Sequence, residues 1–432
     1  MGAFPAIIER LDLDYEETME EETITLVFPQ DPWPRSPVCL LNPRLSCTMS
    51  LRKVRIITTR ATRAIIHLDK FAGNFRAIRK RVGAERRICA AVKADAYGHG
   101  ALAIARASLD AGASCLGVAT VQEGETLRQQ GIAAPILLFS QPLPGEIPRI
   151  VENGLSPLVS DGEFAAMLDD AASRANTRLS VHLKIDTGMG RLGCTPGEAP
   201  ALAGRLAGSA ALEYAGTATH FAVSDSTTPE DLAYTERQIS LFRESLEGIR
   251  AAGLNPGIVH AANSGAIILH PDAWFDMVRP GILLYGYKAA GDHDRGSLRV
   301  EPVMELRTKV VLVKEVAKGE SVSYGRTWVA PRDTAIAVLP IGYADGLPRL
   351  ASNKWQVRIG GGTYPLVGTI CMDQCMVDLG PPPGEARRWD DAVVFGGSAP
   401  GADALAERIG TIPYEIVCNI NRRVPRLYPA GG

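Results

Sequence analysis

The sequence lacks several features that mark whole classes of protein. No apolar run approaches the ~20 residues that a helix needs to cross a bilayer. The 432 residues carry 46 Lys and Arg against 48 Asp and Glu, and no segment forms the basic stripe that is typical of nucleic-acid binding. We therefore expect neither a membrane nor a nucleic acid among the partners of this chain.

Cysteine is also scarce, and 8 in so long a chain do not form a disulfide scaffold. Cys371 and Cys375 lie close in sequence, but no second Cys pair or clustered His pair accompanies them. The sequence therefore predicts no metal site. The N-terminus has no basic segment followed by an apolar one, as a secretory signal would. Reduced thiols and the missing signal indicate a cytoplasmic protein.

The chain divides into three parts by composition. Residues 1–60 are acidic, then rich in proline, then basic, which predicts a disordered N-terminal extension. The length that remains favours two or more domains. A short strand is expected at 63–68, where it precedes the regular part of the chain. This strand has no partner in the predicted barrel, so it can pair with the later β domain.

Residues 61–297 alternate between short apolar runs and amphipathic helical stretches. Eight strand-like runs joined by helices indicate parallel strands, in a barrel or in a doubly wound sheet. Eight is the number of strands in a (β/α)8 barrel, and no glycine fingerprint for a dinucleotide follows the first run, so we predict the TIM-type barrel. The predicted strands are 88–93, 115–119, 135–139, 155–159, 179–185, 214–220, 258–262 and 277–282.

From residue 298 to 432 the pattern changes to alternating runs separated by turn residues, with few helical stretches. This pattern predicts a mostly β C-terminal domain. The fold class is therefore α/β, with a (β/α)8 barrel followed by a β domain. The expected strands of the second domain are 309–316, 335–340, 356–359, 371–379 and 392–395.

Polar and cationic residues follow the predicted barrel strands. Because the carboxyl ends of barrel strands surround the active site in this fold, these side chains should converge. A barrel end that is lined by several cations suits an anionic ligand, such as one carrying a phosphate and a carboxylate. The residues are Lys93, Tyr97, Lys184, Arg191, His220, Asn263, Ser264, Arg279 and Gly281.

Lys93 stands at the end of the apolar run Ile88–Val92. One interpretation is a lysine that reaches out to solvent from a strand end. The other is a catalytic amine whose pKa is lowered by apolar surroundings, so that it can form a Schiff base. His220 is likewise open to two interpretations, as a functional group or as a hydrogen-bonded strand end.

Several long motifs resemble those of the alanine racemase family, in the order in which that family has them. The resemblance runs from about residue 63 to the C-terminus. It implies an enzyme of fold-type III, with a barrel that binds pyridoxal 5′-phosphate and a β domain. The motifs are AVKADAYGHG, LKIDTGMGRLG, ATHFA, AANSGA, MVRPGILLYG, VSYGRTW, IGYADGLPR, ICMDQCMVD and IPYEIVC.

The resemblance also implies roles for individual residues. Lys93 would form a Schiff base with the cofactor. The cofactor's phosphate would be held by Tyr97, Ser264, Gly281, Ile282 and Tyr414. The remaining cofactor contacts would be Arg279 at the pyridine nitrogen, His220 near the ring, Arg191 at the phenolic oxygen, and Asn263. Lys184 matches a lysine that is carbamylated in many members and helps to fix Arg191.

Three further residues would act across a subunit boundary. Tyr324, Met372 and Asp373 match residues that the β domain of one subunit inserts into the active site of the other. Met372 and Asp373, with Arg191, would contact the substrate. The resemblance therefore implies a homodimer whose two active sites are shared.

The implied reaction interconverts L-alanine and D-alanine, and supplies D-alanine for peptidoglycan. It needs a base and an acid on opposite faces of Cα. Lys93 would take the proton from the D-isomer and Tyr324 from the L-isomer. Alternatives are a serine or broad-specificity racemase, a non-enzymatic cofactor-binding protein, which would lack the β domain, and a decarboxylase of the same fold type. A decarboxylase would need an acidic residue in place of Arg279.

Overall fold

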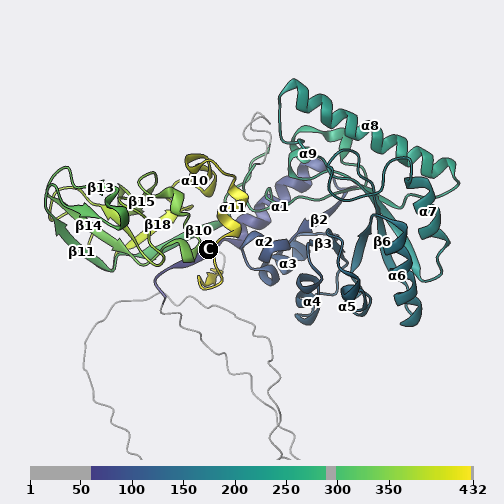
Figure 1. Ribbon diagram of the computed structural model, residues 1–432, viewed down its shortest axis with the longest axis horizontal. Helices are drawn as coiled ribbons and strands as arrows, with labels where there is room; N and C mark the ends of the chain where they lie inside the picture. The colour runs from purple at the N-terminus through teal and green to yellow at the C-terminus, as the bar shows by residue number, and fades with distance from the viewer. Residues whose placement is uncertain (1–59, 289–297, 430–432) are drawn as a thin grey trace, which may run out of the picture.

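The computed structural model describes residues 60–288 and 298–429. These residues form two domains that lie side by side, a barrel surrounded by helices and a β domain (Figure 1). The predicted disordered extension falls on residues 1–59, outside the described residues. The predicted boundary at 297/298 borders residues 289–297, which also lie outside them, and it stays a prediction.

The first domain is a closed barrel of eight parallel strands, in the order β2 to β9. The predicted (β/α)8 barrel is therefore confirmed. Most positions of its strands are buried, and β3 is buried at every position, because helices cover the outside and side chains fill the inside. The strands are β2 (Arg87–Ala91), β3 (Cys115–Val118), β4 (Ile136–Leu138), β5 (Ser156–Val159), β6 (Leu179–Lys184), β7 (Leu212–Ala218), β8 (Ile258–His260) and β9 (Met277–Val278).

Helices with side-chain caps link these strands. Asp161 accepts a hydrogen bond of 2.7 Å from the N–H of Phe164 and begins α6, and Thr228 begins α8 in the same way, as capping chemistry predicts. The outer helices are α3 (Ala101–Asp110), α4 (Val121–Gln129), α5 (Ile147–Glu152), α6 (Gly162–Arg174), α7 (Ala199–Gly208), α8 (Pro229–Ala251) and α9 (Ser264–Leu269).

Helix α1 (Leu68–Val82) precedes the barrel in sequence and packs against α3 and α9. It closes the helical layer beside β9, which no long helix follows among the described residues. Helix α1 begins at Leu68 with His67 as its N-cap residue, and no side chain makes a capping hydrogen bond there.

Within residues 298–429, together with β1, the second domain has three sheets and two C-terminal α-helices. The largest sheet has the strand order β16-β15-β18-β10-β1-β19, beside a sheet β11-β14-β17 and a hairpin β12-β13. Helix α11 (Pro413–Cys418) contacts α2 (Lys93–Tyr97) at the junction with the barrel (Figure 1). The other elements are β1 (Arg63–Ile66), β10 (Met304–Lys309), β11 (Leu312–Val316), β12 (Ser321–Val322), β13 (Trp328–Val329), β14 (Thr334–Leu339), β15 (Gln356–Ile359), β16 (Gly362–Pro365), β17 (Cys375–Asp378), β18 (Asp391–Phe395), β19 (Arg426–Leu427) and α10 (Ala402–Ile409).

Two of the expected strands in this domain were wrong in extent. The run 309–316 is not one strand, because β10 and β11 belong to different sheets and the chain changes sheet between them. The run 371–379 begins with a turn, in which the N–H of Cys371 bonds to the carbonyl of Gln374, and only β17 continues as a strand. That turn carries Met372 and Asp373.

The strand β1 lies in the β domain, where it pairs antiparallel with β10 and parallel with β19. From β1 onward, the described chain therefore runs from the second domain into the barrel and then returns. Asn74 of α1 supports the return crossing, since its side chain bonds to the carbonyls of Leu284 (3.0 Å) and Glu301 (2.8 Å) and to the N–H of Glu301 (2.7 Å).

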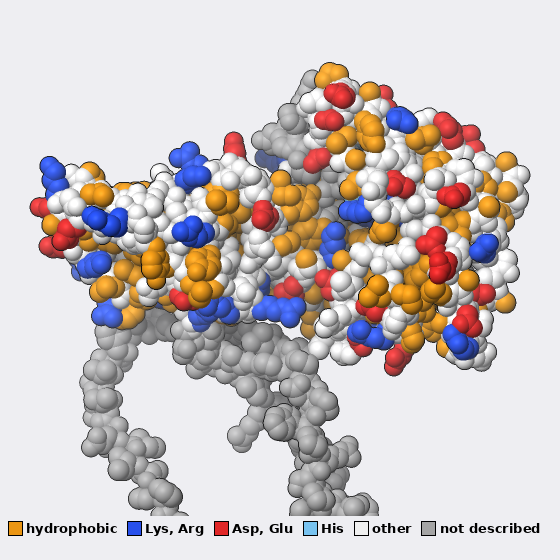
Figure 2. Space-filling view, in the orientation of Figure 1, with side chains coloured by type: hydrophobic (Ala, Val, Ile, Leu, Met, Phe, Trp, Pro, Cys, Tyr) orange, Lys and Arg blue, Asp and Glu red, His pale blue; other side chains and the backbone are white. Residues whose placement is uncertain are grey.

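The surface carries both signs of charge, interspersed over the two domains on the face shown in Figure 2. Among the residues that the structure describes, no helix is both long enough and apolar enough to span a membrane.

Asn74 should therefore contribute to the stability of the two-domain unit. The variant Asn74→Ala leaves three backbone groups of the crossing segment without their partner, and we expect the free energy of unfolding to fall by about 2–4 kcal/mol. Chemical denaturation would measure this, with Lys80→Ala on the exposed face of α1 as the control. A loss within about 0.5 kcal/mol of the control would contradict the assigned role.

Candidate active site

A cavity of about 530 Å³ lies at the carboxyl ends of the barrel strands. The structure brings eleven of the predicted site residues together in its lining. They are Lys93, Tyr97, Lys184, Arg191, His220, Asn263, Ser264, Arg279, Gly281, Ile282 and Tyr414. A larger hollow of about 970 Å³ lies next to it, between the barrel and the C-terminal segment, but none of these residues lines it. We therefore take the smaller cavity as the candidate active site.

Lys93 lies in this cavity at the start of an unusual backbone turn. The four residues that follow it, Ala94 to Tyr97, all have φ of 52–53°, so the turn is a left-handed one built without glycine. Each such residue costs roughly 1–2 kcal/mol, and strain of this kind persists only where the surroundings hold it. The sequence predicted a strand end here but not the hand of the turn.

The turn places Tyr97 under the cavity. Its ring is 6% exposed, and its centroid lies 4.8 Å from that of Tyr285 and 6.0 Å from that of Tyr414. A Cβ atom added at Gly281 would come within 2.4 Å of the Tyr97 hydroxyl. Only glycine therefore allows the backbone of this segment to approach the tyrosine so closely.

Ser264 lies beside the same segment. Its hydroxyl accepts hydrogen bonds from the N–H groups of Gly281 (3.0 Å) and Leu283 (3.3 Å). Ser264 is the first residue of α9 and not its N-cap. The cap is Asn263, whose side chain accepts from the N–H of Ala266 (3.0 Å). The serine, the tyrosine and the glycine segment together form a lining suited to phosphate oxygens.

Arg279 is buried at the base of the cavity and is held on several sides. It donates to His260 Nδ1 (2.7 Å) and to the carbonyls of Thr219 (2.8 Å) and Ala261 (2.9 Å). It also lies 3.3 Å from His220 Nδ1. Burial lowers the pKa of Arg279 to about 10, so it remains charged at neutral pH.

Behind Arg279 stands a histidine pair that the sequence did not single out. Because arginine has only donors, His260 accepts at Nδ1 and carries its proton on Nε2, from which it donates to His182 Nδ1 (2.9 Å). Burial and then the Arg279 charge lower the pKa of His182 to about 4, and they lower the pKa of His260 too. Both rings are neutral at pH 7, as the chain of bonds requires.

Two lysines line the cavity, of which Lys93 is half-buried and Lys184 is buried. Burial, followed by the charge of Arg191, lowers the pKa of Lys93. Burial and the charge of Arg279 lower the pKa of Lys184 to about 7. Both amines are therefore more available in their neutral form than an exposed lysine is. This favours the functional interpretation of Lys93 over that of a lysine reaching out to solvent.

Arg191 reaches the cavity from a loop that Asp186 organises. The Asp186 carboxylate accepts hydrogen bonds from the N–H groups of Gly188 (2.9 Å), Met189 (2.8 Å) and Arg191 (3.2 Å). One side chain thus fixes the backbone of the whole loop after β6. This supporting role of Asp186 was not predicted from the sequence.

The three residues assigned to a partner's site do not join this cavity. Tyr324 is 72% exposed and Met372 is 52% exposed, and Asp373 pairs with Arg423 at 2.8 Å on the β domain. Tyr324 begins a short 3₁₀ turn, Tyr324–Arg326, in which Gly325 and Arg326 have positive φ. The structure therefore separates the two predicted catalytic residues within one chain.

No group of three or more His, Cys, Asp or Glu side chains in residues 60–288 and 298–429 could hold a metal ion. The lining of the cavity also includes Asp225 and Ile412, to which the sequence gave no role.

Comparison with known proteins identifies the family. The family described as alanine racemase, N-terminal domain, matches residues 66–289, and its C-terminal domain matches residues 303–428. An alanine racemase of Treponema denticola is 50% identical over 375 residues, which cover 85% of this chain and 98% of that protein. One of Treponema pallidum is 45% identical, with 84% and 98% covered.

Solved structures agree with this assignment. The alanine racemase of Clostridium difficile 630 has a TM-score of 0.81 at 34% identity, and the match covers 87% of this chain and 96% of that one. The enzyme of Streptomyces coelicolor A3(2) has a TM-score of 0.79 at 39% identity, with 85% and 98% covered. With both domains matched, and with the cavity lined by residues of the family's motifs, this chain belongs to the alanine racemase family.

Proposed function

We propose that this protein is an enzyme that interconverts L-alanine and D-alanine, with pyridoxal 5′-phosphate as its cofactor. The observation that carries the proposal is the cavity at the barrel mouth, where Lys93 has a lowered pKa and stands among cations and phosphate-binding groups. The product D-alanine would serve peptidoglycan synthesis. The six cysteines among the described residues are free thiols, in keeping with a cytoplasmic site of action.

The residues present fit the cofactor. Its phosphate would be bound by Tyr97, Ser264, Gly281, Ile282 and Tyr414, where the missing side chain of Gly281 leaves room beside the Tyr97 hydroxyl. Arg191 would hydrogen-bond the phenolic oxygen, and His220 and Asn263 would lie near the ring. When bound, the cofactor supplies the electron sink that makes the Cα–H of an amino acid acidic.

Arg279 would face the pyridine nitrogen. Arginine offers only N–H donors and keeps its charge, so it would leave that nitrogen unprotonated. Its guanidinium cannot turn away, because His260 and two backbone carbonyls hold it. We expect this arrangement to suppress side reactions such as transamination, at the cost of a harder proton abstraction.

Lys93 would hold the cofactor and then act as the base on one face of Cα. A base must be neutral to accept a proton, and the partial burial of Lys93 lowers its pKa and favours that form. Lys184 would support Arg191. Its pKa of about 7 leaves much of the amine neutral at physiological pH, as reaction with CO₂ to a carbamate requires, so we propose Lys184 as the carbamylated lysine.

Tyr324 would serve the opposite face from a second subunit. Within one chain it points to solvent, as does Met372, so neither can line the cavity of its own barrel in this arrangement. A homodimer in which each β domain completes the partner's cavity would bury these side chains. Asp373 and Met372 would then contact the substrate beside Arg191.

The first test is direct. The purified protein should show the visible absorption band of lysine-bound pyridoxal phosphate and should exchange the Cα hydrogen of both alanine isomers for deuterium in D₂O. The variant Lys93→Ala should lose the band and the exchange together. Exchange with serine or lysine, but not with alanine, would replace the proposal with a racemase of other specificity. A wild-type protein without the band would overturn the proposed cofactor.

A second prediction separates the two bases. In Tyr324→Phe the base for L-alanine is missing, so we expect hydrogen exchange from L-alanine to fall by about 10²–10⁴-fold. Exchange from D-alanine should persist, because Lys93 is intact, although racemisation slows in both directions. Tyr343→Phe, another exposed tyrosine of the β domain, is the matched control. Equal loss of exchange from both isomers would refute the division of roles.

A further inference from the structure

The left-handed turn after Lys93 begins with a backbone donor that the turn itself cannot satisfy. The N–H of Ala96 bonds to the carbonyl of Val92 and that of Gly98 to the carbonyl of Ala94, each at 2.9 Å. The N–H of Ala94 has no such partner within the turn. It bonds instead to Glu123 Oε1 of α4 at 2.6 Å.

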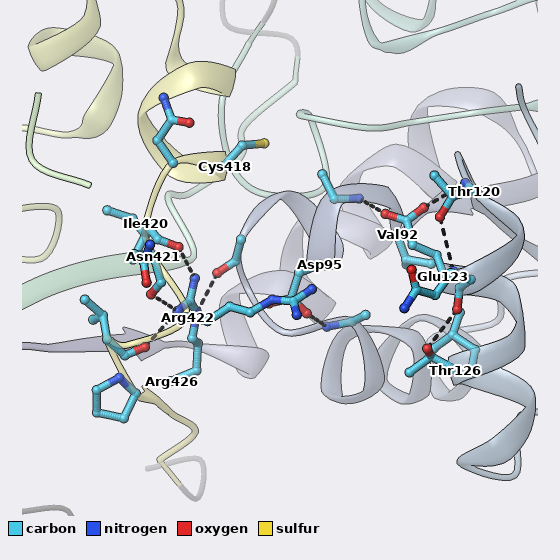
Figure 3. A pocket seen from close by; sticks show the side chains of 18 residues that line it. Val92, Asp95, Thr120, Glu123, Thr126, Cys418, Ile420, Asn421, Arg422 and Arg426 are labelled. Atoms are coloured by element: carbon cyan, nitrogen blue, oxygen red, sulfur yellow. Dashed lines mark hydrogen bonds between the residues drawn. The ribbon is translucent and has the colours of Figure 1, made fainter. Parts of the chain in front are cut away.

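Glu123 is held in place by the start of its own helix. Its second oxygen, Oε2, accepts hydrogen bonds from the N–H groups of Ala119 (2.8 Å) and Thr120 (3.1 Å). The Thr120 hydroxyl in turn accepts from the N–H of Glu123 at 3.2 Å, which completes a capping box. Figure 3 shows the Glu123 carboxylate between Thr120 and the segment that follows Val92.

We propose that Glu123 is a positioning residue for catalysis: it holds the strained turn in its left-handed form and thereby fixes the direction in which Lys93 enters the cavity. The proposal rests on the proposed function, since it assigns Glu123 a role through Lys93. A helix cap is usually local, but this carboxylate joins the N-terminus of α4 to the residue next to the catalytic amine.

Only a carboxylate of this length meets the three donors. Glutamine would offer one acceptor oxygen, and its NH₂ group would face a backbone N–H that also donates. Aspartate is one methylene shorter and could not span from the cap to Ala94. The charge matters too, because Glu123 raises the pKa of Lys93 against the larger lowering by burial and Arg191.

The variant Glu123→Gln tests this role, with Glu146→Gln as the matched control. Glu146 also accepts from a backbone N–H three residues earlier, that of Leu143 at 3.0 Å, but this bond stays within its own 3₁₀ turn, whereas Glu123 also bonds to Ala94. In Glu123→Gln we expect the amide of Ala94 to exchange its hydrogen at least tenfold faster, and half-saturation with pyridoxal phosphate, followed by visible absorption, to need several-fold more cofactor. Neither quantity should change in Glu146→Gln.

The pH profile separates positioning from mere loss of structure. The value of kcat depends on the ionisation of groups in the enzyme–substrate complex. With D-alanine as substrate, the acidic limb of the kcat–pH profile should therefore follow the protonation of Lys93, which is a free amine in that complex. Removing the Glu123 charge lowers the pKa of Lys93, so in Glu123→Gln this limb should move to lower pH while the maximal rate falls about 10- to 100-fold. In Thr120→Ala, which keeps the carboxylate on Ala94, the limb should stay in place.

An unmoved acidic limb, or cofactor half-saturation equal to that of Glu146→Gln, would overturn the proposal. Unchanged hydrogen exchange at Ala94 would overturn it as well, and this readout does not depend on the reaction. If the wild-type protein neither binds the cofactor nor acts on alanine, the proposed function fails, whereas the effect of Glu123 on the turn is still measured by exchange.

Discussion

The structure depends on one electrostatic constraint, which is that several cationic side chains line a single cavity. Lys93, Lys184, Arg191 and Arg279 all line it, and burial lowers the pKa of both lysines and of Arg279. Groups of like charge at close range destabilise one another unless an anion enters. A ligand with a phosphate and a carboxylate would reduce that repulsion. The two lysines favour their neutral form, because burial lowers the pKa of each.

Much of the fold and the site could be predicted because local patterns specify them. Short apolar runs alternating with capped helices gave the barrel, and the position of each polar residue just after a strand placed Lys93, Arg279 and the others at one mouth. The parts that could not be predicted depend on non-local contacts. The pairing of β1 with β10 and the change of sheet between β10 and β11 are examples.

The supporting residues were missed for a related reason. Nothing near His182 or His260 in sequence indicates that they are bonded to each other and, through His260, to Arg279. The left-handed turn at Ala94 to Tyr97 contains no glycine, so its sequence resembles an ordinary helix start. The carboxylate that bonds to this turn belongs to Glu123 of α4, which lies well apart from it in sequence. No sequence pattern therefore identifies the residues that maintain the strained backbone near Lys93.

One chain keeps the two proposed catalytic residues apart, since Lys93 lies in the barrel cavity and Tyr324 is exposed on the β domain. We propose that each active site takes Lys93 from one subunit and Tyr324 from the other. Mixed dimers of Lys93→Ala and Tyr324→Phe chains measure this directly. If sites are shared, each mixed dimer contains one site with both residues intact, and racemase activity returns on mixing two inactive proteins. Mixed dimers that form but remain inactive would contradict the claim.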